Sequence, residues 1–243
     1  MNRSRSKVFC SLTIAAILLA IHGCGLTPGS VEVGPLQTES QSVELGDAES
    51  VRVEIEMGAG ELEVAGGADE LMEADFTYNV AELKPEVVYS GDTLTIQQPD
   101  VEGIASLGDL DGYRYEWDLR LNDDVHMDLS IGLGAGTMDL RLSGLSLTAL
   151  EVDIGAGEGK LDLTGEWPSD LDASIMAGVS SLTVVLPGEV GARVEIDGIS
   201  RVNANGLMQD GNTYVNDVYG VSDVTLEINI EAGIGEINLE LGE

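Results

Sequence analysis

The chain has 243 residues, with 44 Asp and Glu against 11 Lys and Arg, so its formal net charge is −33 at neutral pH. A protein this acidic is a poor partner for nucleic acid and for anionic lipid surfaces. The charge favours cations, cationic peptides or basic polymers as partners. It is equally compatible with plain solubility or with a salty medium in which charge is screened. The composition thus argues against nucleic-acid binding without naming a ligand.

The N-terminus has the features of an export signal. Three cations precede an apolar run, 8–21, which is shorter than the roughly 20 residues that span a bilayer. The glycine and Cys24 that follow resemble the cleavage site of bacterial lipoproteins, although His22 stands where a small residue is usual. The resemblance implies a signal peptide over 1–23 and an extracytoplasmic protein anchored by lipid on Cys24. The membrane would be the outer one if the cell has one, because Gly25 follows the cysteine. An ordinary secretory signal with a chance cysteine is the alternative.

Residues 24–47 are predicted to be the lipidated cysteine and a flexible tether, because proline, glycine and polar residues are frequent there. Cys24 is the only cysteine outside the predicted signal, so no disulfide is expected within the chain that remains. All 44 acidic residues lie after Cys24 with 8 of the cations, which gives that part a net charge near 8 − 44 = −36. Stability must therefore come from an apolar core.

From residue 51 onward apolar and polar residues alternate, which is typical of strands with one solvent-exposed face. The alternation is clearest over 51–55, 73–78, 85–89, 93–96, 127–131, 226–230 and 236–241. The only helix-like stretch is 68–74. The segment 99–112 is rich in glycine and lacks alternation, and it predicts a boundary between two domains. A turn at 122–124, after an alternating stretch over 114–121, is hairpin-like.

One phrase recurs six times: a strand, a turn of small residues, then a second apolar alternation. Clear copies occupy 53–64, 129–140 and 152–163, and weaker ones surround Gly178, Gly198 and Gly233. The first apolar residues after the turns define steps of 23, 21, 20 and 35 residues; they are Met138, Leu161, Leu182, Val202 and Ile237. Steps of 20 to 23 are typical of one coil of a β-solenoid, with glycine at tight corners.

The sequence therefore predicts an all-β solenoid with glycine-rich corners. The last, longer step predicts an extra coil through 214–219. Because a stack of strands ends in unpaired edges, the final strand over 239–241 is expected to need a cap or a partner.

The sequence offers little that catalysis could use. Gly-Ala-Gly-Glu-Gly-Lys160 lacks the first glycine and the final Ser or Thr of a phosphate-binding loop, and a strand rather than a helix follows it. The repeat is too long for a nine-residue calcium repeat. His126 is the only histidine outside the signal, and its place in an alternating run predicts an exposed strand residue. Neither an enzymatic activity nor a cofactor is expected, and a carbohydrate-active enzyme with a carboxylate pair is a remote alternative.

Aligning the copies indicates a column of carboxylates. One polar position carries Asp128, Glu151, Asp172 and Glu227, and Glu195 joins them after a shift of one residue. Stacked strands would place these groups about 4.8 Å apart, and like charges on neighbouring strands repel. We therefore expect counter-ions, and the hypothesis is that the column binds divalent cations or cationic peptides. A solvated face without a ligand is the alternative.

Several stretches resemble a known bacterial family. Those over 48–62, 76–87 and 94–96 are similar to the N-terminal toast-rack domain. Those around 117–122, Gly134-Ala-Gly, Ile154-Gly-Ala-Gly, Val185-Leu-Pro and Ile230-Glu-Ala-Gly-Ile-Gly are similar to the adjoining toast-rack β-helix, which is shared with proteins that respond to cell-wall-active antibiotics.

The resemblance implies an all-β, right-handed β-solenoid. It divides the chain into an N-terminal domain over 48–100, a linker over 101–112 and a β-helix domain over 113–243. It also implies a non-enzymatic, adhesin-like binding or scaffolding module on the cell envelope, with another envelope protein as a partner. An envelope-stress or antibiotic-response sensor that acts through a membrane partner is the alternative. No catalytic motif is carried over.

Overall fold

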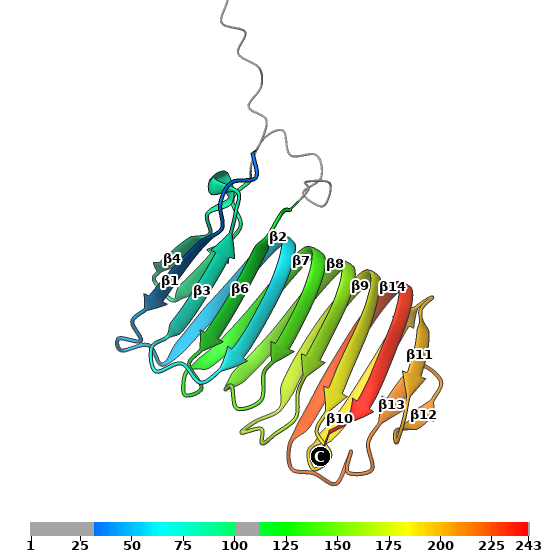
Figure 1. Cartoon of the computed structure of the whole chain (residues 1–243). Helices are drawn as coiled ribbons and strands as arrows, with labels where there is room; N and C mark the ends of the chain where they lie inside the picture. The colour runs from blue at the N-terminus through cyan, green and yellow to red at the C-terminus, as the bar shows by residue number, and fades with distance from the viewer. Residues whose placement is uncertain (1–31, 101–111, 243) are drawn as a thin grey trace, which may run out of the picture. The chain divides into compact units, whose positions relative to one another are not determined.

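The computed structural model describes residues 32–100 and 112–242. In these ranges the chain forms one sheet of fourteen strands, and its single helical segment is the short 3₁₀ turn η1 (Ala81–Leu83) (Figure 1). The prediction of an all-β protein is confirmed. The strands are β1 (Gln37–Val43), β2 (Ser50–Gly66), β3 (Met72–Tyr78), β4 (Glu86–Ser90), β5 (Thr93–Gln97), β6 (Tyr115–Leu121), β7 (His126–Arg141), β8 (Leu147–Asp162), β9 (Leu171–Leu186), β10 (Gly191–Gly198), β11 (Arg201–Ala204), β12 (Met208–Asp210), β13 (Thr213–Val215) and β14 (Thr225–Leu241). The predicted signal peptide, Cys24 and nearly all of the predicted linker lie outside the described residues.

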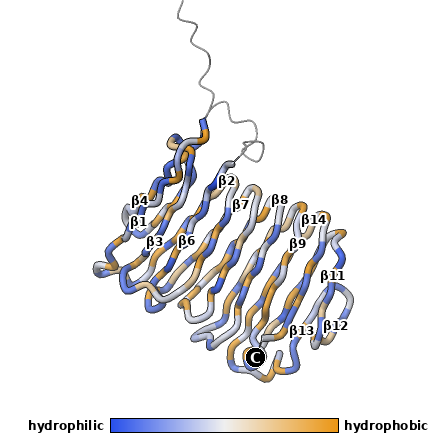
Figure 2. The backbone as a smooth tube through the Cα atoms, viewed as in Figure 1, coloured by the Kyte–Doolittle hydropathy of each residue, from blue (hydrophilic) through white to orange (hydrophobic). Residues whose placement is uncertain are grey.

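Five long strands carry the repeated phrase: β2, β7, β8, β9 and β14, each of 16 or 17 residues. Each has two arms that meet at a bend of small residues. Within the arms buried and exposed residues alternate, so that Val53 and Ile55 in the first arm of β2 and Leu62 and Val64 in its second arm are buried. Figure 2 shows this alternation as changing colour along the strands. The inward side chains of both arms belong to one hydrophobic core.

The glycines lie at the bends, where neighbouring strands come closest. A Cβ on Gly134 would collide with the carbonyl oxygen of Gly58, and a Cβ on Gly155 would collide with that of Gly134. Gly136 has a φ of +138°, which L-residues rarely adopt, and it lies against the backbone of Gly60. The bends can stack only because these positions have no side chain.

The long strands pair in parallel, β2 with β7, β7 with β8, β8 with β9 and β9 with β14. Met138 pairs with Gly159 rather than with Leu161, and Gly159 pairs with Leu182. The steps between these equivalent residues are therefore 21 (138 to 159) and 23 (159 to 182) residues. The predicted alignment on Leu161 is wrong, because the stacked glycines set the register and the apolar residues after them do not.

The order of the stack departs from the order of the chain. β14 lies between β9 and β10, pairing with β9 along both arms and with β10 and β11 on its other side. After β11 the chain turns back through the antiparallel pair β12 and β13, then enters this gap. The predicted extra coil over 214–219 is wrong, because β13 pairs antiparallel with β10. The predicted exposed edge at 239–241 is also wrong, since β14 has neighbours on both sides up to Leu239.

The opposite end of the sheet holds three further differences from the sequence-based expectations. Residues 37–43, inside the predicted tether, form β1, which pairs with β3. The helix-like stretch 68–74 forms no helix: residues 69–71 are a bend, and β3 begins at Met72, from which buried residues alternate with the period of a strand. The predicted hairpin at 122–124 does not form, since β6 and β7 both pair in parallel with β2. The sheet continues directly from β2 to β7, although the predicted linker separates them in sequence, and the domain boundaries stay a prediction.

Buried asparagines fix the loops at both ends of the sheet; they are Asn79, Asn122 and Asn216. Asn216 is only 1% exposed. Its Nδ2 donates to the carbonyl oxygens of Pro187 (3.0 Å) and Val190 (2.7 Å). Its Oδ1 accepts from the backbone N–H of Ala192 at 3.0 Å. Asn216 thus ties the loop between β9 and β10 to the segment that leads into β14.

Candidate binding surface

The five predicted carboxylates lie on the outer side of the first arms, in two rows. The first row crosses the strands as Arg52, Asp128, Ala149, Asp172, Glu227 and Arg193. The second row lies two residues further along as Glu54, Ser130, Glu151, Ser174, Asn229 and Glu195. The structure therefore brings Asp128, Asp172 and Glu227 into one row and places Glu151 and Glu195 in the next.

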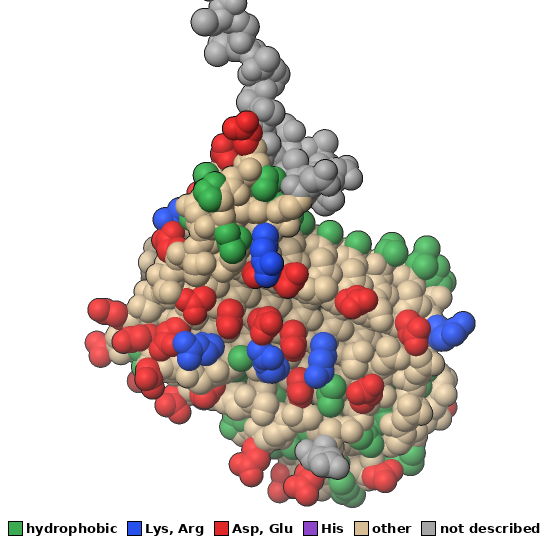
Figure 3. Space-filling view, viewed as in Figure 1, with side chains coloured by type: hydrophobic (Ala, Val, Ile, Leu, Met, Phe, Trp, Pro, Cys, Tyr) green, Lys and Arg blue, Asp and Glu red, His purple; other side chains and the backbone are tan. Residues whose placement is uncertain are grey.

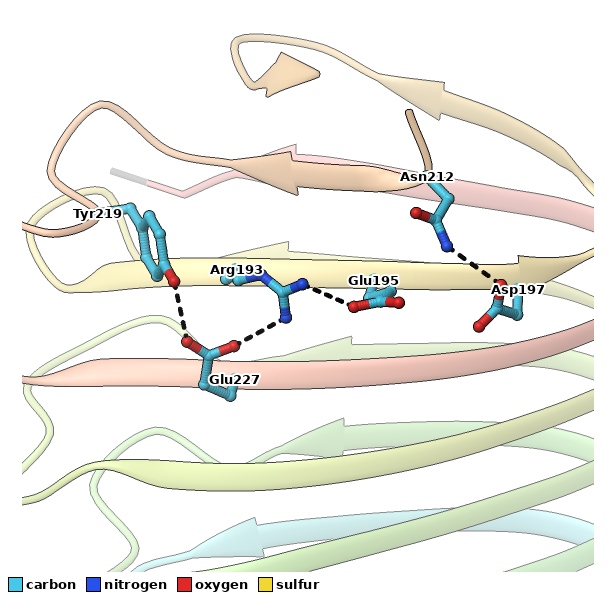
Figure 4. Close-up of polar contacts among 6 residues, drawn as sticks. All are labelled: Arg193, Glu195, Asp197, Asn212, Tyr219 and Glu227. Atoms are coloured by element: carbon cyan, nitrogen blue, oxygen red, sulfur yellow. Dashed lines mark hydrogen bonds and ion pairs between the residues drawn. The ribbon is translucent and has the colours of Figure 1, made fainter. Parts of the chain in front are cut away.

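Arginines neutralise both ends of the first row. Arg52 Nη2 lies 2.9 Å from Asp128 Oδ2. At the other end Arg193 bridges Glu195 (2.6 Å) and Glu227 (3.1 Å), as Figure 4 shows. These hydrogen bonds, the one to Glu195 first, raise the pKa of Arg193. The repulsion expected of an uninterrupted acidic column is reduced because arginine and alanine share the row, although Asp172 and Glu227 remain direct neighbours.

The second row separates its carboxylates with serine and asparagine. Ser130 and Ser174 flank Glu151 on the neighbouring strands, and Asn229 lies between Ser174 and Glu195. Over the described part of the chain, no three His, Cys, Asp or Glu side chains come close enough to hold a metal ion. His126 is exposed at the start of β7, as predicted.

A third row lies next to the bend and has a different character. It runs as Glu56, Gly132, Asp153, Met176, Glu231 and Asp197. Among the described residues no Lys or Arg forms an ion pair with any of its four carboxylates. Asp197 accepts a hydrogen bond only from the neutral amide of Asn212, at 3.1 Å (Figure 4). Burial, followed by repulsion from Asp153, raises the pKa of Glu56. The negative charge of this row is thus unneutralised.

The bends themselves form a line of side chains, exposed in all but the partly buried Ala59, which we call the corner ridge: Ala59, Ala135, Ala156, Val179, Ile234 and Ile199. Its last three members are large and β-branched, with exposed fractions of 62% for Val179, 63% for Ile234 and 79% for Ile199. Figure 3 shows hydrophobic side chains in a row along the edge where the strands bend. Side chains of this type are usually buried in a sheet.

Between the third row and the corner ridge lies a shallow hollow of about 500 Å³, which we call the corner groove. Its floor contains glycine and alanine of β8, β9, β14 and β10, with the side chain of Met176 among them. Asp153, Glu231 and Asp197 lie along its border. The groove therefore joins an apolar floor to carboxylates without ion-pair partners.

Sequence reasoning missed this surface, although the signal for it is present. In the copies of the repeated phrase, the residue between the two small residues of the turn is alanine in the first three and Val179, Ile199 or Ile234 in the others. A residue at the tip of a bend cannot reach the core. Bulky apolar residues at that position therefore mark an exposed patch.

The geometry first defines a class of protein: an all-β scaffold in which long parallel strands display rows of side chains on their outer surface. The matching family model is the N-terminal domain of toast_rack, DUF2154, and it covers residues 32–185. The chain belongs to this toast-rack family. The match includes strands on both sides of the predicted linker, and it confirms the resemblance seen in the sequence.

Several solved structures match the chain, and the following one has the same fold. One from Clostridium sporogenes, described as a "putative cell adhesion protein", is 33% identical with a TM-score of 0.79, and the alignment covers 86% of this chain and 100% of that one. A second from Bacteroides fragilis, described as a "putative adhesin", is 12% identical with a TM-score of 0.37, covering 84% and 97%. No functionally curated protein matches the chain. The described residues contain no helix with the length and apolarity of a membrane span.

Proposed function

We propose that this protein is a non-catalytic, adhesin-like binding module on the outside of the cell, held at the membrane by lipid on Cys24. The observation that carries the proposal is the corner ridge, where Val179, Ile234 and Ile199 are exposed side by side. Contiguous exposed apolar side chains rimmed by charge are characteristic of interaction sites. The likeness to the Clostridium sporogenes protein, whose description refers to cell adhesion, supports the same function.

The scaffold suits this role because it is built as a stack. We propose that its long strands are successive turns of a right-handed β-solenoid, with β14 entering out of chain order. The parallel registers and the stacked glycines support this arrangement. In such a stack each turn fixes its neighbours, so rows of side chains are presented at a regular spacing of about 4.8 Å.

The lipid anchor is tested by labelling. Cells that express the full chain are fed a radiolabelled fatty acid, and the protein is followed in membrane and soluble fractions. The expected result is label and membrane association that both disappear in Cys24→Ala. Cys10→Ala, in the predicted signal, serves as the matched control and should change neither. Label that persists in Cys24→Ala, or an unlabelled parent chain, would refute the anchor.

The binding role is tested on whole cells. Bacteria that display the full chain should be retained on a layer of neighbouring cells under flow better than bacteria that lack it. Replacing Val179 and Ile234 with serine should reduce retention without changing the amount of protein on the surface. Equal retention of displaying and non-displaying cells would refute the proposed function.

A further inference from the structure

We infer that the corner groove docks a peptide segment in which bulky apolar side chains alternate with Lys or Arg. This inference rests on the proposed binding function and names the chemistry of the partner. The large members of the corner ridge lie on neighbouring strands: Val179 on β9, Ile234 on β14 and Ile199 directly after the end of β10. Apolar side chains on successive strands form a continuous strip that a partner can cover.

The groove beside this strip can take side chains from a partner. Apart from Met176, its floor is formed by backbone and small residues, including Gly155, Gly178 and Gly233, which leave the hollow open to a partner. Met176, 40% exposed, is the one large side chain on that floor. An unbranched, flexible methionine adapts to different apolar partners. The site therefore favours apolar groups without demanding one exact shape.

The carboxylates decide the sign of the partner's charge. Asp153, Glu231 and Asp197 border the groove and have no ion-pair partner in the described ranges. In the first row, by contrast, Arg52 and Arg193 form ion pairs with carboxylates at the two ends. The chain as a whole carries a charge of −33. Lys or Arg side chains beside an apolar contact would therefore gain both local ion pairs and long-range attraction.

The same charges count against the other occupants of an apolar strip. A second copy would bring two sets of groove carboxylates together, and each copy is strongly acidic. An anionic membrane surface would be repelled for the same reason. Charge complementarity thus selects a cationic, partly apolar peptide over a self-association or lipid-binding role.

The test uses the full-length exported protein and three fluorescent ten-residue probes: alternating Lys and Leu, all Lys, and alternating Glu and Leu. Anisotropy is followed at about 0.15 M salt, where exposed charges are already partly screened. The expected result is saturable binding of the Lys–Leu probe, much weaker binding of the all-Lys probe and none of the Glu–Leu probe. Equal binding of the first two probes would overturn the inference, because charge alone would then suffice.

Paired variants locate the site. Val179→Ser with Ile234→Ser should weaken Lys–Leu binding at least about tenfold, since the contact area of two β-branched side chains is lost. Val88→Ser with Val221→Ser removes two exposed valines elsewhere, with exposed fractions of 55% and 78%, and should change affinity less than about twofold. If both pairs weaken binding alike, the groove is not the site.

A second pair of variants isolates the charges. Asp153→Asn with Glu231→Gln should weaken binding several-fold. Glu151→Gln with Asp172→Asn removes the same charge from the first two rows and should have a smaller effect. Equal effects would show a diffuse electrostatic attraction and overturn the docking site.

Two further measurements distinguish a failure of the cationic-peptide inference from a failure of the proposed adhesin-like function. Groove-dependent binding to anionic vesicles but not to the Lys–Leu probe would identify a lipid partner and overturn the inference. If cells that display the Asp153→Asn, Glu231→Gln variant are retained as well as cells that display the parent chain, the cationic-peptide inference fails. The adhesin-like function would not be contradicted by that result.

Discussion

Replacing Asn216 with alanine tests how the sheet accommodates β14 out of chain order. The Asn216 side chain is 1% exposed and makes three hydrogen bonds to backbone groups of the loop between β9 and β10. Alanine would leave the carbonyls of Pro187 and Val190 and the N–H of Ala192 without these partners. At about 1 kcal/mol per bond, the expected loss of unfolding free energy is about 3 kcal/mol.

Equilibrium unfolding in urea measures this loss. The transition midpoint should fall while its slope stays unchanged, and the thermal midpoint should fall by roughly 6–12 °C for a body of this size. Asn229→Ala is the matched control, because Asn229 lies exposed on the second row, and it should cost less than about 0.5 kcal/mol. A loss below that value in Asn216→Ala would refute the reasoning, because the loop would then be held by other contacts.

The remaining predictions concern the bends, the tyrosines and the charged rows. Gly136→Ala should lower the unfolding free energy measured in urea by more than about 3 kcal/mol, because a Cβ there meets the backbone of Gly60. Gly91 has open space around it, so Gly91→Ala should lower the unfolding free energy by only about 1 kcal/mol. Burial raises the pKa of Tyr113 to about 12, so Tyr113→Phe should remove an absorbance step near that pH in an alkaline titration. Because the folded-state pKa of Tyr113 lies above the ordinary value, burial of its neutral hydroxyl contributes fully to the stability of the fold below about pH 10. This contribution is lost as pH rises through the raised pKa. Arg193→Gln should lower the urea midpoint slightly at low salt and less at high salt, since its carboxylate partners are partly solvent-exposed.

Specific outcomes would contradict these expectations. Equal losses in the two glycine variants would show that the bends are not closely stacked. If the absorbance step that Tyr113→Phe removes lies near pH 10, Tyr113 is not buried. A salt-independent loss in the arginine variant would mean that Arg193 acts through packing rather than through charge.

The strands could be predicted from the sequence because their signal is local. Val51, Val53 and Ile55 alternate with polar residues, and the structure buries each of them. The glycines of the repeated phrase likewise marked the bends. Both patterns follow from the geometry of one strand and need no knowledge of its neighbours.

The order of the strands could not be predicted in this way. β10 and β14 carry similar apolar alternation, and both could pair with β9. β14 pairs with β9 from Leu226 to Leu241, along both arms, whereas β10 and β11 are short and separated by a break. The longer strand buries more apolar surface against β9, and that total depends on contacts distant in sequence.

The prediction of a single acidic column is wrong because it aligns one strand in the wrong register. Asp128, Asp172 and Glu227 each lie six residues before the first glycine of their bend, but Glu151 lies only four before Gly155. Ala149 is the residue six before Gly155, and it pairs with Asp128 in the same register as the bends, so it takes the expected position. A shift of two residues keeps the same face exposed, and for that reason the alternation pattern gave no warning of it.

The placement of the carboxylates indicates whether a face of the protein serves only solubility or also binds a partner. A face that served only solubility would spread its carboxylates over polar surroundings, as the second row does with Ser130 and Ser174. The third row instead leaves Asp153 and Glu231 unneutralised directly beside the apolar corner groove. Exposed isoleucine and valine work against solubility, so a demand for solubility cannot account for the ridge. Because the two features meet at one place, a partner that satisfies both explains the surface better than either feature does alone.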